Sequence, residues 1–144
     1  MRLGGSIAVA LLLVQSPFLA RADDAPRGAA DAFGRALTTG SAKALRPLLP
    51  DKGKVRLELD HLGPAHGTYG GSQVEAILGD FLAEGSVASF EVLSVDGDDR
   101  SFGLARGRAT LTDRGGRPAR VIVHLSFELE AQRWVLRGIK ETAE

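Results

Sequence analysis

The sequence predicts an α+β domain in which helices pack on one face of a strongly bent antiparallel sheet. Three observations support this fold class. Segments in the first half carry apolar residues at helical spacing. Segments in the second half alternate between apolar and polar residues, as half-buried strands do. Short turn sequences rich in Gly and Asp join those strands, which indicates a meander with helices on one face.

Two helices and a strand are predicted first. Residues 29–37 place apolar side chains on one helical stripe, and Gly40 is expected to stop that helix. Ser41 is placed to cap a second, short helix over residues 42–49, which Pro50 ends. Residues 54–62 then alternate, which predicts a strand. The glycine-rich segment 63–71 is expected to be a loop.

The best-marked helix is predicted to begin at Ser72. The run Ser72-Gln73-Val74-Glu75 fits a capping box, in which the serine hydroxyl accepts from the Glu75 amide and the glutamate reaches back. Gly85 is expected to end the helix. Its apolar stripe consists of Val74, Ile77, Leu78, Phe81 and Leu82.

The remaining chain is predicted to form strands in series. They cover residues 88–95, 102–112, 120–130 and 133–140, with turns at 96–99, 113–116 and 131–132. In strand 120–130 one face is apolar and the other is mostly polar. The apolar face holds Val121, Val123, Leu125, Phe127 and Leu129, and the other face holds Ile122, His124, Ser126, Glu128 and Glu130.

The first 22 residues have the three parts of a cleavable secretion signal. Arg2 precedes an apolar run over residues 7–14, and Ala20-Arg21-Ala22 provides a small-x-small cleavage site. The run is shorter than the roughly 20 apolar residues of a membrane span. A buried N-terminal helix is the alternative, but such a helix would carry polar residues at helical spacing. We expect cleavage after Ala22, a flexible leader over 23–28, and one domain over 29–144 in the periplasm or outside the cell.

The charge balance limits the classes of partner that the chain is expected to bind. The chain has 144 residues, no cysteine, and 18 basic against 18 acidic residues. Loss of the signal removes Arg2 and Arg21 but no acid, so acids exceed bases by two in the remainder. Nucleic acids and anionic membranes select basic surfaces, and we therefore expect neither as a partner after signal cleavage.

Several short motifs resemble a known superfamily. They are Gly67-Thr68-Tyr69, Ser72-Gln73-x-Glu75 followed by Phe81, and the closing hairpin Phe127-x-Leu129-x-x-x-x-Trp134-x-Leu136. With the element order, they resemble the nuclear transport factor 2-like superfamily, the cone-shaped α+β fold shared with ketosteroid isomerases and polyketide cyclases. Within it, the chain resembles small exported bacterial domains of unknown function. The resemblance covers residues 29–140.

The resemblance implies a cone that encloses a pocket for a small apolar ligand. The pocket candidates are Phe33, Tyr69, Phe81, Leu82, Phe127 and Trp134. Trp134 can instead be interpreted as core, which its hairpin position favours, and Tyr69 as a staple before the helix. The superfamily's isomerases use an aspartate base with a tyrosine and a protonated acid, whereas Tyr69, the one tyrosine, precedes the capped helix. A non-catalytic domain that binds an apolar ligand or a protein is therefore predicted, without a cofactor. The alternative is an isomerase- or cyclase-type enzyme.

A second candidate site is the polar face around His124. Glu128 shares that face, and Arg106 and Arg108 on the neighbouring strand join it if the register is suitable. The group could bind an anion or move a proton. It could instead be a solvated face held by Arg–Glu pairs. A third interpretation is a homodimer face, with Ile122 as its apolar contact, because sheets of this superfamily often pair through the outer surface.

A metal site near Asp60 is the weakest candidate. His61 and His66 flank a Gly-Pro loop and could join Asp60 as ligands. No helical register aims these side chains at one point, so we interpret them as exposed loop residues and predict no metal.

Overall fold

A six-stranded sheet with the strand order β2-β1-β6-β5-β4-β3 organises the chain. The computed structural model describes residues 25–98 and 101–144, and the predicted secretion signal lies outside these residues. In chain order the elements are α1 (Ala25–Thr39), the 3₁₀ helix η2 (Ala42–Leu48), β1 (Val55–Leu59), β2 (Ala65–Tyr69), α2 (Gly71–Glu84), β3 (Ser86–Asp98), β4 (Phe102–Thr112), β5 (Pro118–Glu130) and β6 (Arg133–Ala143).

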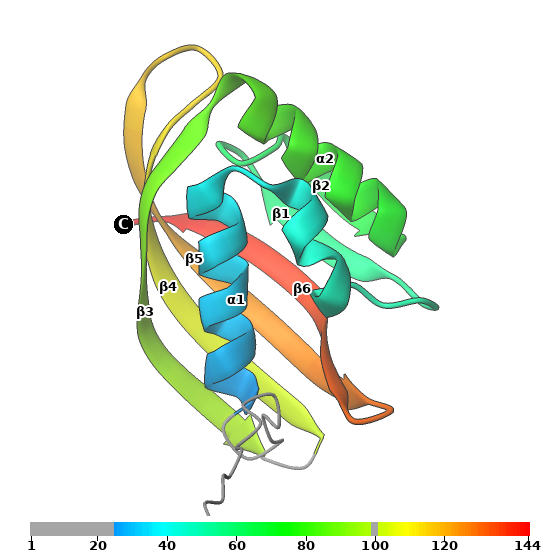
Figure 1. The fold of residues 1–144 in the computed structure, drawn as a ribbon. Coiled ribbons are helices and arrows are strands. Elements are labelled where there is room, and N and C mark those ends of the chain that lie inside the picture. The colour runs from blue at the N-terminus through cyan, green and yellow to red at the C-terminus, as the bar shows by residue number, and fades with distance from the viewer. Residues whose placement is uncertain (1–24, 99–100) are drawn as a thin grey trace, which may run out of the picture.

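The predicted α+β class is confirmed. All neighbouring strands are antiparallel except β1 and β6, which are parallel. The three helices lie on one side of the sheet, and the strands curve around them (Figure 1). The inner face of the sheet and the helices share one hydrophobic core, whereas the outer face lies opposite the helices. No helix in the described ranges is long and apolar enough to cross a bilayer.

The segment predicted as a loop over 63–71 contains a strand, which corrects that prediction. Residues 65–69 form β2, which pairs with β1 so that Gly67 lies opposite Leu57. The glycine has a φ of 151° and offers no side chain to the alternation from which strands are predicted. Pairing with the apolar strand β1 therefore decides the structure here, rather than the local composition.

The capping box predicted at Ser72 is also wrong. Helix α2 begins at Gly71 with Gly70 as its N-cap, and Oε1 of Gln73 accepts the Gly70 N–H at 2.8 Å. A side chain at Gly71 would place its Cβ 2.8 Å from the carbonyl oxygen of Pro50. The helix can therefore start closer to η2 than the serine pattern indicates. Gly85 caps the other end, as predicted.

Glu75 has a different role from the predicted one. Its carboxylate accepts two hydrogen bonds from Arg46, at 2.8 and 3.0 Å, and so joins α2 to η2. The Arg46 hydrogen bond lowers the pKa of Glu75. Ser41 caps η2 as predicted, because its Oγ accepts the Ala44 N–H. Pro47 lies inside η2, which is a 3₁₀ rather than an α-helix.

Two predicted boundaries need correction. Helix α1 begins at Ala25, so residues 25–28 of the predicted leader form its first turn. Pro26 fits that position, since its fixed φ suits the start of a helix and its missing N–H costs nothing there. Strand β3 continues through Asp98, past the turn predicted at 96–99, and residue 99 lies outside the described part. Gly97, with a φ of 129°, pairs with Gly103 and allows the backbones of β3 and β4 to approach closely there.

Candidate functional site

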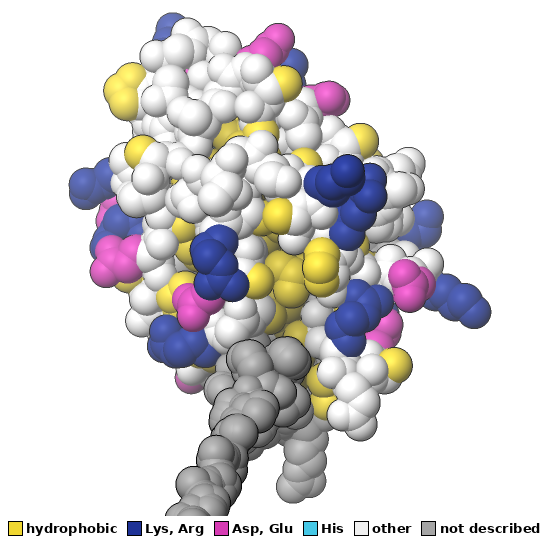
Figure 2. All heavy atoms as spheres, viewed as in Figure 1, with side chains coloured by type: hydrophobic (Ala, Val, Ile, Leu, Met, Phe, Trp, Pro, Cys, Tyr) yellow, Lys and Arg dark blue, Asp and Glu magenta, His cyan; other side chains and the backbone are white. Residues whose placement is uncertain are grey.

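The residues predicted to line a pocket lie in the hydrophobic core. Phe33, Phe81 and Phe127 have no exposed surface, and Trp134 is 6% exposed. Tyr69 and Leu82 are partly buried and pack against the same core. Figure 2, drawn from the helix side, shows apolar side chains gathered between α1 and η2. The structure thus brings the six residues into one apolar interior.

One polar atom in this interior is left without a hydrogen bond. The indole Nε1 of Trp134 is buried and has no partner among the described residues. Buried N–H groups are nearly always paired with protein or ordered water, so an orphan donor calls for an explanation. A ligand with an acceptor atom would supply the missing bond.

The outer face of the sheet brings the second predicted group together. Arg106 lies opposite His124 in the β4–β5 register, and Arg108 lies opposite Ile122. On the other side of β5, His124 lies opposite Lys140. We call this surface the outer face; its centre is formed by Asp96, Leu104, Arg106, His124, Ser126, Gly138 and Lys140.

Two apolar side chains are exposed on this face. Phe102 and Leu104, on β4, are 43% and 45% exposed, and they are the large hydrophobic residues with open surface in the described ranges. Hollows of about 220 and 150 Å³ flank Leu104, and both are also lined by His124. The larger hollow lies over Gly138, where a Cβ would come within 2.7 Å of Ser126 Oγ. A glycine thus keeps the hollow open in the middle of the sheet.

Part of the charge on the outer face is paired within the chain. Arg108 contacts Glu91 at 2.9 Å and Glu144 at 2.5 Å, and Glu144 also contacts Arg120 at 3.1 Å. Glu128 pairs with Arg137 at 2.8 Å rather than with Arg106 or Arg108. These exposed pairs are of the kind that contributes little to stability.

Three charged residues around His124 remain unpaired. Within the described residues, Arg106, Lys140 and Asp96 have no ion-pair partner at 4.0 Å or less. His124 Nε2 lies 3.0 Å from Thr142 Oγ1. Burial, and then the charges of Arg106 and Lys140, lower the pKa of His124. The centre of the face therefore combines an apolar contact, an imidazole whose protonated form is disfavoured, and charges of both signs without partners in the described residues.

A second polar group, which the sequence analysis missed, lies at the β1–β2 turn. The Glu141 side chain is 3% exposed and accepts backbone N–H bonds from Asp60, His61 and Leu62 at 2.9 to 3.1 Å. The His61 ring Nδ1 lies 2.7 Å from the same carboxylate. An acid on the apolar face of the last strand, between Ile139 and Ala143, was the available signal.

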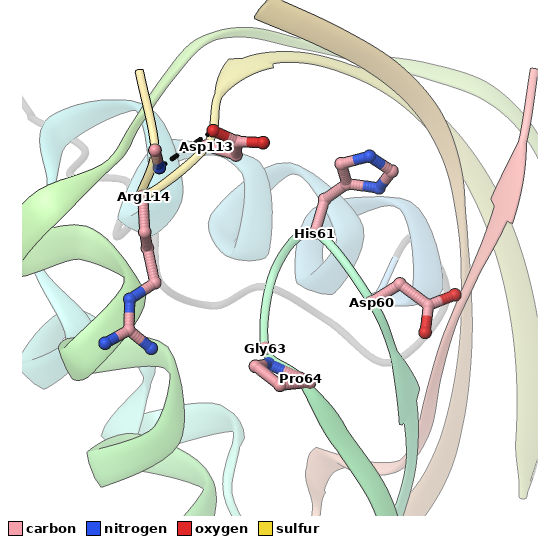
Figure 3. A pocket seen from close by; sticks show the side chains of 7 residues that line it. Asp60, His61, Gly63, Pro64, Asp113 and Arg114 are labelled. Atoms are coloured by element: carbon pink, nitrogen blue, oxygen red, sulfur yellow. Dashed lines mark hydrogen bonds between the residues drawn. The ribbon is translucent and has the colours of Figure 1, made fainter. Parts of the chain in front are cut away.

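The turn borders a hollow of about 290 Å³ between β1–β2 and the β4–β5 hairpin (Figure 3). Asp113 lies across it from His61, and Arg114 extends toward α2, where it pairs with Glu84. Backbone N–H groups of Arg117 and Gly115 donate to Asp113 and lower the pKa of its carboxyl group. The hollow is thus lined by side chains that are already engaged.

The residues considered for a metal site form separate pairs. His66 Nε2 lies 3.0 Å from Asp60 Oδ1, and His61 contacts Glu141 instead. In the described ranges, no three His, Cys, Asp or Glu side chains meet as a metal ligand set.

Comparisons with known proteins place the fold. No protein-family model and no curated protein matches the chain. Among solved structures, a DUF4783 family protein from Bacteroides uniformis is 18% identical, with a TM-score of 0.64 over 79% of this chain and 95% of that one. A domain of unknown function with a cystatin-like fold from Nostoc punctiforme is 13% identical, with a TM-score of 0.65 over 85% of this chain and 78% of that one.

A putative dehydratase of the NTF2-like family from Streptomyces avermitilis is similar as well. It is 16% identical, with a TM-score of 0.60 over 85% of this chain and 96% of that one. At such identities the likeness concerns the fold, and of these three neighbours the dehydratase alone has a name that suggests an activity. The chain has the NTF2-like, cystatin-like fold and resembles small bacterial domains of unknown function.

Proposed function

We propose that this chain is an exported, non-catalytic domain that binds a second copy of itself through the outer face of its sheet. The observation that supports this most directly is Leu104 of β4, which is 45% exposed between two hollows on the outer face. Exposure of a large apolar side chain to water is unfavourable. Burying such a side chain contributes roughly 1.5–3 kcal/mol.

Shape supports a protein partner on this face. A side chain that projects between two hollows can enter a hollow on the facing surface, while the facing projection fills its neighbour. Two identical surfaces satisfy this condition, since a two-fold interface pairs each feature with its counterpart. Leu104 of each copy would then lie in a hollow of the other, next to Gly138 or Asp96.

Charge supports a second copy in particular. Arg106 and Asp96 line the same hollow of about 150 Å³ and have no partner within the described chain. In a two-fold pair, Asp96 of one copy can approach Arg106 of the other, and the reverse contact forms at the same time. The surface thus offers both halves of the ion pair that it needs.

A second candidate function is the binding of a small apolar ligand in the cone. The unpaired indole N–H of Trp134 favours it, together with the apolar side chains between α1 and η2. The enzyme alternative would need an ionisable group in the interior. The buried charged side chain in the described part is Glu141, whose carboxylate already holds the β1–β2 turn.

Native mass spectrometry of the protein recovered from the exported fraction of its own host tests the proposal. We expect a chain that begins at Asp23 and a dimer without added mass. Leu104→Glu should raise the dimer Kd at least about a hundred-fold, because it buries a charge in an apolar contact. Thr112→Glu, exposed on the same strand and face, is the matched control and should stay dimeric.

Other results would decide against parts of the proposal. A monomer that carries a reproducible small mass would favour the cone ligand, and mutation of Trp134 to Phe should then weaken its binding. A dimer that Leu104→Glu leaves unchanged would place the contact elsewhere. A chain that retains residues 1–22 in the exported fraction would contradict cleavage after Ala22.

A further inference from the structure

We propose that His124 makes the self-association pH-dependent, so that the two copies separate when the solution becomes acidic. This inference rests on the proposed function, because it concerns the same outer face. It assigns a role to a histidine that the packing of the fold does not require. His124 lies on the outer side of β5, away from the hydrophobic core, and borders both hollows.

The neighbours of His124 argue against a positive charge at this point. Arg106 on β4 and Lys140 on β6 lie directly opposite it in the two registers, so a protonated ring would be the middle of three cations in a row. Neither has an ion-pair partner in the described chain. Thr142 Oγ, 3.0 Å from Nε2, can accept from or donate to the ring but cannot offset a charge.

The acids near His124 do not compensate for these cations. Asp96 on β3 lines the smaller hollow, and Glu58 on β1 lies opposite Lys140 but contacts Arg56 at 3.5 Å. A second copy adds another Asp96 and Glu58 and, with them, another Arg106 and Lys140. The remaining charged groups that line the hollows are Arg56 and Arg137, both cations.

Association of two copies would further raise the free-energy cost of protonating His124. His124 is only partly buried in the single chain, where burial and the two cations already lower its pKa. A second copy would remove water from the ring and further disfavour the protonated form. If pairing lowers the pKa of each ring by one unit, full protonation weakens the dimer about ten-fold per ring, or about a hundred-fold for two.

Sedimentation velocity of the mature chain at pH 7.5 and pH 5.0 tests the inference. At pH 5.0 most carboxyl groups with ordinary pKa values, about 3.9 to 4.3, remain ionised, whereas His124, whose pKa is lowered from the usual histidine value, takes up protons as the pH falls toward that lowered pKa. We expect the wild-type dimer Kd to rise at least about ten-fold at pH 5.0. His124→Gln, which keeps a neutral hydrogen-bonding side chain, should change less than about two-fold. His61→Gln, outside the face, should behave as the wild type does.

The outcomes separate the two proposals. A dimer whose Kd does not change with pH, or whose pH dependence persists in His124→Gln, would overturn the inference and leave the proposed function intact. A monomer at both pH values would overturn both. If His124→Gln does not fold, NMR titration of the wild-type ring at low and high protein concentration decides instead, since the pKa must fall as dimer forms.

The folding of the single chain must also be checked at pH 5.0, because protonation of His124 lowers its stability as well. Because the pKa of His124 is lower in the folded than in the unfolded chain, its stabilising contribution is complete above the unfolded value and is lost as pH falls toward the folded one. Circular dichroism at both pH values shows whether dissociation occurs between folded chains.

Discussion

At the scale of single residues, the buried carboxylate of Glu141 connects strand β6 to the β1–β2 turn through several hydrogen bonds. It stands on the inner side of β6, opposite Val123, in a row that is otherwise apolar. Three successive backbone N–H groups and the His61 ring surround it. Hydrogen bonds to a charged acceptor are stronger than those between neutral groups, so this one side chain can hold the β1–β2 turn over the end of the cone.

Replacing that carboxylate should therefore lower stability. Glu141→Gln keeps the size but removes the charge and brings an NH₂ group among backbone N–H donors, where the neighbouring acceptor is the His61 ring nitrogen. We expect the free energy of unfolding to fall by about 2–4 kcal/mol, measured by urea denaturation. Glu144→Gln, near the end of the same strand, is the control and should have a much smaller effect, because its pairs are exposed. Equal stability of wild type and Glu141→Gln would show that an amide satisfies the turn.

At the scale of secondary-structure elements, one aromatic ring sets how α1 lies on the sheet. Phe90 of β3 lies between Gly34 of α1 and Gly107 of β4, and it meets Phe33 edge-on at a ring distance of 5.6 Å. A Cβ added at Gly107 would lie 2.4 Å from the ring, and one at Gly34 would lie 2.6 Å from it. The two glycines form the slot that lets the helix approach the strands.

Filling the slot should separate these elements. Gly107→Ala is expected to destabilise the fold by about 1–3 kcal/mol through overpacking, measured by thermal or urea unfolding. Adding Phe90→Leu should recover part of the loss, because the ring is the obstacle. Gly28 lies in α1, and a Cβ added there would have no heavy atom within 4 Å. Gly28→Ala should therefore stabilise the fold by roughly 0.5–1 kcal/mol. If Gly107→Ala is as stable as wild type, Phe90 can leave the slot freely.

The same elements show how far the sequence could predict the fold. Strand β4 was predicted at its observed bounds, because a half-buried strand between two turns alternates throughout. Strand β2 was missed since its pairing with β1, not its own composition, makes it a strand. The start of α2 was misplaced because the contact of Gly71 with Pro50 joins residues 21 positions apart in the sequence.

The candidate site was predictable to a similar degree. Alternation placed His124 and Glu128 on one face, and the register then brought Arg106 and Arg108 beside them. The partners differ from those that sequence suggested, because Arg137 of β6 takes Glu128. Glu141 could not be paired with residues 60–62 from the sequence, since the parallel contact of β1 with β6 joins the two ends of the domain.

At the scale of the whole molecule, the described residues leave one large surface of the sheet without a covering layer. The helices cover only the inner side of the sheet (Figure 1). An antiparallel sheet can leave its other side in water when that side is polar. Here the Arg–Glu pairs lie toward the margins of the outer side, whereas Leu104 is exposed among charged groups that have no ion-pair partner in the described residues. An exposed apolar side chain beside unpaired charges is the kind of surface that the proposed pairing of two copies would cover.

A charge exchange between copies tests whether this surface pairs with itself. Arg106→Asp leaves two acids and Asp96→Arg two cations in the smaller hollow, so each variant alone should dimerise at least about ten-fold more weakly than wild type. Mixed in equal amounts, the variants should form a heterodimer, which native mass spectrometry distinguishes by mass. Each chain then supplies the charge that the other lacks.

The choice of control decides what a positive result means. Arg120→Asp lies on the same face, but Arg120 is paired with Glu144 in its own chain. Mixing it with Asp96→Arg should restore no heterodimer, because only a charge near the smaller hollow can meet its counterpart across a two-fold axis. Restoration by both mixtures would indicate general electrostatic attraction. If neither Arg106→Asp nor Asp96→Arg weakens the dimer, the copies meet through another surface. The exposed Leu104 would then need a different partner.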